Sequence, residues 1–301
     1  MRASLAAVAL IALAAGCGSK TSSSTRGAPK PGSLEELWHN SGQSVSLIPG
    51  TSDYSPGNLR ISFLIVDPHG RVISPLRARV WVGRSLGERP FAEAIARRQP
   101  VGVPGVSTGS DVKTLFVAHV RVPEPGSYFV VARPIGSVRI AGLRELLVRS
   151  SSASPAVGSR AYPSRTPTIA STRGRISALT TRVPPDRALL RTSIAAALAG
   201  HEPFVVTFAT PRYCESRTCG PVVDVVDRVR KRNARTQIRF IHVEIYQGND
   251  PRKGPNRWVR EWRLPGEPWT FLVGRDGRIK AKFEGSVSAQ ELQDAIRRFL
   301  L

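Results

Sequence analysis

The stretch that decides the fold is FVVTFATPRYCESRTCGPVVDVVDRV, which runs from Phe204 to Val229. Its first five residues, Phe204 to Phe208, are apolar and rich in β-branched side chains, which predicts a buried strand. A short loop then carries Cys214 and Cys219, and Gly220-Pro221 opens an amphipathic helix. Two thiols therefore lie where a strand gives way to a helix.

The junction between strand and helix favours reactive cysteines. Unpaired N–H groups and the positive end of the helix dipole stabilise a thiolate at a helix N-terminus, so the pKa of a cysteine there is expected to fall. The helix start lies closest to Cys219, whereas the end of the strand leads into Cys214. The residues thus predict a thiol–disulfide centre and leave open which thiol attacks.

The segment FATPRYCESRTC resembles the strand–loop–helix element of the thioredoxin-like superfamily, particularly its extracytoplasmic TlpA-type and redoxin-type members. Four residues separate the cysteines here, in place of the usual two. Aligned on the strand, Cys214 takes the nucleophile position of the family. Aligned on Cys-Gly-Pro, Cys219 takes it, and Val222 replaces the resolving cysteine. We favour Cys214, because the first cysteine in the family is the exposed one.

Further segments carry the same resemblance. The run VGSRAYPSRTPT, which begins at Val157, is similar to the opening of TlpA-type and peroxiredoxin-type domains. Pro268, preceded by Glu267, takes the place of the cis-proline of the family, which abuts the disulfide and binds the thiol substrate. The predicted strand from Gln237 to Tyr246 places His242 and Glu244 on one face.

The polar pair His242 and Glu244 is unusual for a strand that helices cover on both faces. The family keeps an ionisable group beneath its cysteines, and the usual acidic place is apolar here. His242 and Glu244 could substitute as a base or as a group that tunes the thiolate pKa. The alternative is a polar pair that is satisfied at the end of a strand.

The N-terminus resembles a bacterial lipoprotein signal. Met1-Arg2 supply a positive region, Ala3 to Ala15 supply an apolar stretch too short to span a bilayer, and small residues precede Cys17. The resemblance implies that Cys17 is lipidated and that the mature chain is extracytoplasmic and anchored to the membrane. An ordinary secretory signal with an incidental Cys17 is the alternative.

The cysteine count agrees with this interpretation. Of three cysteines, one is used for the anchor, and Cys214 and Cys219 remain in an oxidising compartment, where a pair can form a disulfide. A purely structural disulfide is the alternative. We favour a redox pair, because a bond that closes so small a loop constrains the unfolded chain little.

The charge argues against a nucleic-acid partner. The chain has 44 basic and 22 acidic residues, a formal net charge of +22, and most of the basic residues are arginines scattered singly along the sequence. Scattered charge is typical of a solvated surface, whereas nucleic-acid binding usually gathers basic residues on one face. We expect a monomer without cofactor or metal, whose partner is a protein thiol or disulfide.

The N-terminal half predicts a β-rich domain. Asn58 to Asp67 and Leu76 to Val82 are expected to form one hairpin, and Thr114 to Val122 and Ser127 to Ala132 a second. Short strands separated by Pro/Gly turns suggest a β-sandwich. PEPGSYFVVA resembles the corner before a late strand of immunoglobulin-like domains, with Tyr128 in the tyrosine-corner place.

The predicted organisation follows from these segments. It comprises a signal peptide (1–17), a flexible tether (18–34), an immunoglobulin-like β-sandwich (35–149), a Pro/Ser-rich linker (150–165) and a thioredoxin-like α/β domain (166–301). The predicted function is thiol–disulfide exchange through Cys214 and Cys219. Two alternatives remain. The first is a copper-delivery protein similar to the Sco group, although the cysteines of that group are three residues apart and its later histidine is missing here. The second is a catalytically silent adaptor.

Overall fold

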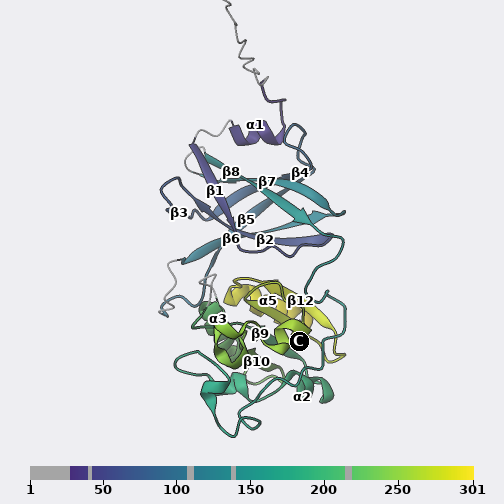
Figure 1. The fold of residues 1–301 in the computed structure, drawn as a ribbon. Helices are drawn as coiled ribbons and strands as arrows, with labels where there is room; N and C mark the ends of the chain where they lie inside the picture. Colours follow the sequence, from purple (N-terminus) through teal and green to yellow (C-terminus); the bar gives the residue numbers. More distant parts are fainter. Residues whose placement is uncertain (1–27, 40–42, 107–111, 137–139, 214–218) are drawn as a thin grey trace, which may run out of the picture.

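The computed structural model describes residues 28–39, 43–106, 112–136, 140–213 and 219–301. Figure 1 shows two units stacked end to end, with strands β1 to β8 in one and β9 to β12 in the other. Helix α5 and strand β12 lie on the side of the second unit that faces the first.

The first unit is a closed β-barrel. Seven strands follow one another around it in the order β1-β8-β7-β4-β5-β6-β2, and the pairing of β1 with β2 closes the ring, while the short β3 extends β2. All pairs are antiparallel except β1 with β8. The strands are β1 (Gln43–Pro49), β2 (Gly57–Val66), β3 (Val72–Ile73), β4 (Arg77–Gly83), β5 (Ala92–Pro100), β6 (Thr114–Val122), β7 (Gly126–Pro134) and β8 (Ile140–Val148).

Alternating side chains fill the barrel. In β2, Leu59, Ile61, Phe63 and Ile65 are all buried in one core cluster, as the period of two of a strand requires. A second, smaller cluster lies where the short helix α1 (Leu34–His39) packs on β4, β7 and β8. There Leu34 contacts the buried Trp81 and Val131.

The predicted immunoglobulin-like sandwich is wrong. The expected strands form, but neither expected hairpin does, because β4 pairs with β5 and β7, and β6 pairs with β2 and β5. The unpredicted strands β1 and β5 change the topology: β1 closes the ring, and β5 separates β4 from β6. Strand β5 reads AEAIARRQP, and its alanines and charged residues have low β-propensity.

The second unit contains a four-stranded sheet of order β10-β9-β11-β12. Only β10 and β9 are parallel, and the other two pairs are antiparallel. Every residue of β9 and β11 is buried, as expected of central strands covered on both faces. The strands are β9 (Phe204–Phe208), β10 (Arg239–Val243), β11 (Trp269–Val273) and β12 (Ile279–Glu284).

Short helices cover both faces of this sheet. The helices α3 (Cys219–Arg232) and α5 (Ala289–Phe299) pack together over one face, where Val222, Val226 and Leu292 join the core. On the other face, α2 (Ile194–Ala199) and α4 (Arg257–Glu261) accompany a core built on Trp262, Phe208 and Phe271. Ser288 caps α5 by accepting a hydrogen bond from the Glu291 N–H at 3.1 Å.

These features overturn the predicted fold class. The described residues are predominantly β, they are built on a closed mixed barrel, and only 21% of them are helical, so the fold is not a thioredoxin-like α/β fold preceded by a sandwich. The prediction failed because it rested on short motifs and on the order of elements along the chain. A motif specifies local structure, whereas strand pairings between distant segments decide the class.

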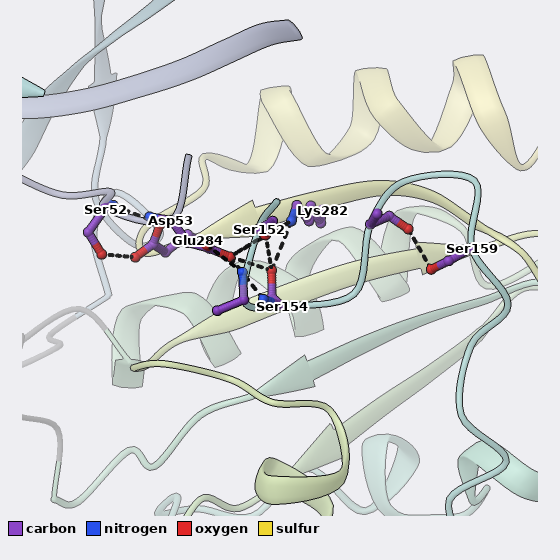
Figure 2. A network of polar contacts seen from close by, with 9 residues as sticks. Ser52, Asp53, Ser152, Ser154, Ser159, Lys282 and Glu284 are labelled. Carbon is purple, nitrogen blue, oxygen red and sulfur yellow. Dashed lines mark hydrogen bonds and ion pairs between the residues drawn. The ribbon is translucent and has the colours of Figure 1, made fainter. Parts of the chain in front are cut away.

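A network of polar contacts joins the two units (Figure 2). The carboxylate of Asp53, which follows β1, accepts hydrogen bonds from Ser152 and from the backbone and side chain of Ser154. The Lys282 ammonium on β12 donates to the Ser152 hydroxyl at 2.5 Å and to the Ser154 hydroxyl at 2.9 Å. The segment predicted as a linker is therefore held between the barrel and the second sheet.

A partly buried ion pair lies at the same junction. Arg60 on β2 donates to both carboxylate oxygens of Glu291 on α5, at 2.6 and 2.9 Å, and to the Ser286 carbonyl at 2.7 Å. Nearby, a Cβ at Gly285 would lie 2.2 Å from the Gly50 carbonyl oxygen, and the φ of Gly285 is +71°. Only glycine therefore permits this approach of the two backbones.

Candidate functional site

The end of β9 is the point from which the chain runs toward the cysteines. Phe208, the last residue of β9, is paired with Val243 of β10 on one side and with Trp269 of β11 on the other. The Glu267–Pro268 peptide bond directly before β11 is cis. Pro268 therefore directly precedes Trp269, the residue of β11 that pairs with the last residue of β9.

The cysteines are only partly covered by the structure. Cys214 lies outside the described residues, and so does Cys17. Cys219 is the first residue of α3, a helix of 14 residues whose valines are buried against the sheet. The backbone thus places Cys219 at a helix start, five residues along the chain from Cys214.

His242 holds the start of the segment that leads to Cys214. Its side chain is buried, with 5% of its surface exposed, and its Nε2 donates a hydrogen bond to the Ala209 carbonyl at 3.0 Å. A carbonyl only accepts, so Nε2 carries the proton in this arrangement. His242 therefore fixes the backbone directly after β9 and does not offer Nε2 as a base.

Glu244 holds the other end of the same segment through Thr181. Its Oε1 accepts hydrogen bonds from the Thr181 N–H at 2.5 Å and from the Thr181 hydroxyl at 2.8 Å. The hydroxyl oxygen of Thr181 accepts in turn from the Arg212 N–H at 3.1 Å. The two polar side chains of β10 and its extension thus anchor residues 209 and 212, immediately before Cys214.

A cavity of about 430 Å³ opens beside Glu244. His242, Glu244 and Trp258 line it, together with apolar side chains that include Leu179 and Pro167. Glu244 and Trp258 each also carry one buried polar atom, Glu244 Oε2 and Trp258 Nε1, that has no hydrogen-bond partner among the described residues. Both atoms are inaccessible to solvent, so neither is exposed to the cavity.

The two tryptophans of the α4 segment have different surroundings. Trp258 and Trp262 lie four residues apart, a spacing that predicts packing on one face of a helix. Trp262 does so, since it is fully buried and its Nε1 donates to the Ser164 hydroxyl at 2.9 Å. Trp258 is partly buried, packs against the same core and also lines the cavity. A spacing of four places two side chains on one helix face but does not specify what that face meets.

Thr181 was missed at the sequence level. It lies in an irregular segment, 63 residues before the Glu244 that it contacts, and no local pattern marks it. Asn256 was also missed: its amide donates to the Glu244 carbonyl at 2.5 Å, and its side-chain oxygen caps α4. An asparagine before a helical run is an N-cap signal, which could have located the helix start but not its contact with Glu244.

Metal and membrane features were searched over the described residues alone. Within them, no three histidine, cysteine or acidic side chains are gathered as a metal site would require. The same residues include no helix of sufficient length and hydrophobicity to cross a bilayer.

Comparison with known proteins adds no family: no protein-family model matches the chain, and no curated protein matches it significantly.

Proposed function

We propose that the protein is a thiol–disulfide exchange protein of the cell envelope, anchored by a lipid on Cys17. Cys214 and Cys219 form the reactive pair, and the partner is a protein thiol or disulfide. The observation that supports this most is the double anchoring of residues 209 to 212. His242 and the Thr181–Glu244 pair hold the backbone directly before Cys214, and α3 begins at Cys219.

The anchoring matters because exchange demands geometry. An attacking sulfur must approach the partner disulfide in line, and a loop that is held at its base loses less entropy when it does so. The N–H groups at the start of α3 stabilise a thiolate in the loop. Together these features place the pair between an anchored segment and the start of a helix.

The proposed reaction has two steps. The thiolate of one cysteine attacks a partner disulfide, a mixed disulfide forms, and the departing partner sulfur leaves as a thiolate and takes up a proton. The second cysteine loses its proton and attacks the mixed disulfide, so the partner leaves as a dithiol and the Cys214–Cys219 disulfide remains. The partner is reduced by two electrons, and the pair is oxidised by two; the reverse direction uses the same steps.

Alkylation of the reduced protein across pH tests the proposal. Cys214 is expected to react first, with an apparent pKa below the free-thiol value of about 8.5. The matched variants Cys214→Ser and Cys219→Ser assign the two rates. If both thiols react as unperturbed cysteines and mild oxidation forms no disulfide, exchange is excluded and the adaptor becomes the better proposal. A reduction potential measured against glutathione then gives the direction of electron flow.

The anchor is tested separately. Full-length chain expressed in a bacterium with a lipoprotein pathway is expected to fractionate with membranes and to carry lipid on Cys17. Cys17→Ala is expected to leave the chain unprocessed or to release it. A wild-type chain that is recovered wholly soluble without detergent would contradict the anchor and leave the exchange chemistry untouched.

A further inference from the structure

Four arginines from three strands meet on the outer face of the barrel. The register of the strands places Arg77 of β4 directly opposite Arg97 of β5, and Arg79 of β4 directly opposite Arg133 of β7. Ala78, which lies between the two arginines of β4, is buried in the barrel core, so its neighbours point away from that core. We call Arg77, Arg79, Arg97 and Arg133 the arginine patch.

The positive charge of the arginine patch is largely uncompensated. Arg79 forms an exposed ion pair with Glu93, at 3.1 Å, whereas Arg77, Arg97 and Arg133 have no ion pair with an acidic side chain of the described residues. Like charges directly opposite each other destabilise a pair of strands, so the pairing of Arg77 with Arg97 does not serve the stability of the barrel. An anionic partner would relieve this repulsion.

A packed tryptophan supports two members of the patch. The guanidinium carbons of Arg133 and Arg79 lie 4.9 and 6.0 Å from the centre of the Trp81 ring, and Trp81 Nε1 donates to Glu93 at 3.1 Å. Trp81 is itself buried in the cluster that Leu34 of α1 joins. The arginine patch therefore adjoins α1 and presents its charge from a rigid base.

Exposed aliphatic side chains border the same patch. Ile95 pairs with Arg79 across the strands, and the Ile135 N–H donates to the Arg77 carbonyl at 3.0 Å. Both isoleucines are exposed, and so is Leu76, which precedes β4. Basic residues with exposed aliphatic neighbours suit the boundary between headgroups and acyl chains of an anionic bilayer. A nucleic-acid interface is typically more polar, so the apolar border favours a lipid surface.

The position of α1 places the patch near the proposed anchor. Figure 1 shows α1 at the end of the molecule farthest from the second unit, with β4, β7 and β8 beside it. Leu34, the first residue of α1, lies 17 residues after Cys17, so a lipid on Cys17 keeps α1 within ~60 Å of the bilayer. Tethering of this kind raises the effective concentration of the patch at the membrane surface.

We propose that the arginine patch docks on the anionic headgroups of the membrane and turns this face of the barrel toward the bilayer. Each guanidinium binds lipid phosphate through its planar N–H groups, and the bordering aliphatic side chains enter the headgroup boundary. The inference gives the barrel a role that thiol exchange does not require. It rests on the proposed function only for the lipid on Cys17.

Vesicle binding by the full-length Cys17→Ala chain tests the patch without the lipid anchor. The chain is titrated with vesicles of phosphatidylcholine alone and with vesicles that also contain about a third phosphatidylglycerol. We expect at least ~10-fold tighter binding to the anionic vesicles, and this preference should weaken as salt is added. The leader is present in every variant of this chain and contributes equally to each comparison.

A triple variant, Arg77→Gln/Arg97→Gln/Arg133→Gln, is expected to bind the anionic vesicles at least ~10-fold more weakly. The matched control removes the same charge from exposed positions on and just after α3 of the second unit, and it should lower binding less than ~3-fold. This control is Arg228→Gln/Arg232→Gln/Arg235→Gln.

Arg97→Gln separates docking from folding. It removes one member of the like-charge pair, so stability in urea should stay equal or rise, while binding to anionic vesicles should fall about fivefold. A structural role for Arg97 would instead lower stability.

Two outcomes would overturn the proposal: no preference of the Cys17→Ala chain for anionic vesicles, or equal losses for the two triple variants, which would mean that net charge alone attracts the protein. Either result leaves the proposed function intact, because thiol reactivity and the lipid on Cys17 are measured separately.

Discussion

The barrel and the second unit satisfy their buried polar groups to different degrees. Side-chain atoms that are buried without a partner among the described residues include Ser62 Oγ in the barrel, but Thr210 Oγ1, Glu244 Oε2, Trp258 Nε1 and Trp269 Nε1 in the second unit. The barrel closes its edges and pairs its backbone all around the ring. Unsatisfied buried groups that persist in a native fold call for an explanation. Among the described residues, the second unit therefore holds more buried side-chain atoms without a partner than the barrel does.

The change with the largest expected effect tests whether the barrel unfolds independently of the second unit. Phe116 is 1% exposed and stacks on Phe63 with ring centres 5.6 Å apart. Phe116→Ala is expected to lower the free energy of unfolding of the barrel by about 3–5 kcal/mol, because it removes apolar contacts and leaves a cavity. Amide hydrogen exchange checks the location: β6 should lose protection and β9 should keep it.

Leu76→Ala is the control for this change, since Leu76 is 70% exposed and its truncation should alter stability by less than about 0.5 kcal/mol. Equal loss of protection in β6 and β9 would mean that the two units unfold as one, and the comparison would then break down.

The junction between the units is expected to give the next largest effect. Arg60 and Glu291 are 11% and 14% exposed, so Arg60→Ala leaves a largely buried carboxylate without its partner. We expect a loss of about 2 kcal/mol, less than for a fully buried pair, measured by urea unfolding. Arg297→Ala, which breaks the exposed pair with Asp294, should cost less than about 0.5 kcal/mol. Similar losses for both arginines would contradict a structural junction.

A change at Thr181 sharpens the functional side of the comparison. Thr181→Val keeps the shape of the side chain but removes the hydroxyl that joins Glu244 to the Arg212 N–H. We expect about 1 kcal/mol lower stability and a ~3- to 10-fold slower reaction of the reduced protein with oxidised glutathione. Thr236→Val, whose hydroxyl donates to the Asn233 carbonyl, is the control. An unchanged exchange rate would show that the anchor of the loop has no part in reactivity.

The smallest expected effect is a loss of stability of the folded state at acid pH. Burial opposes ionisation of Asp53, but hydrogen bonds from Ser152, Ala153 and Ser154 outweigh it and hold its pKa below 3.8. The carboxylate therefore stabilises the folded state above its ordinary pKa, and this contribution is lost as the pH falls from about 4 through the lowered pKa.

The stability difference between wild type and Asp53→Asn should shrink over that acid range, as followed by urea unfolding at several pH values. Glu145→Gln, an exposed change on β8, is the control. A difference that stays constant down to pH ~2 would exclude Asp53 as the titrating group.

Parts of the fold were predictable because they depend on neighbouring residues. The buried strand from Phe204 to Phe208, the helix after Gly220 and the turn before Tyr128 follow from local hydrophobic pattern and turn residues. The Tyr128 hydroxyl even donates to the Glu124 carbonyl at 2.8 Å, the hydrogen bond typical of a tyrosine corner. This local feature nevertheless occurs in a barrel, not a sandwich.

The sequence by itself determined which segments become buried strands, where the thiols lie along the chain, and that His242 and Glu244 are polar residues on an otherwise apolar strand. Only the tertiary structure decided that β1 closes a ring, that Thr181 joins Glu244 to the segment before Cys214, and that Trp258 lines a cavity. The physical reason is the range of the interactions. Periodicity and capping act over a few residues, whereas strand pairing and buried hydrogen bonds join segments far apart in sequence, and packing of the whole chain selects among them.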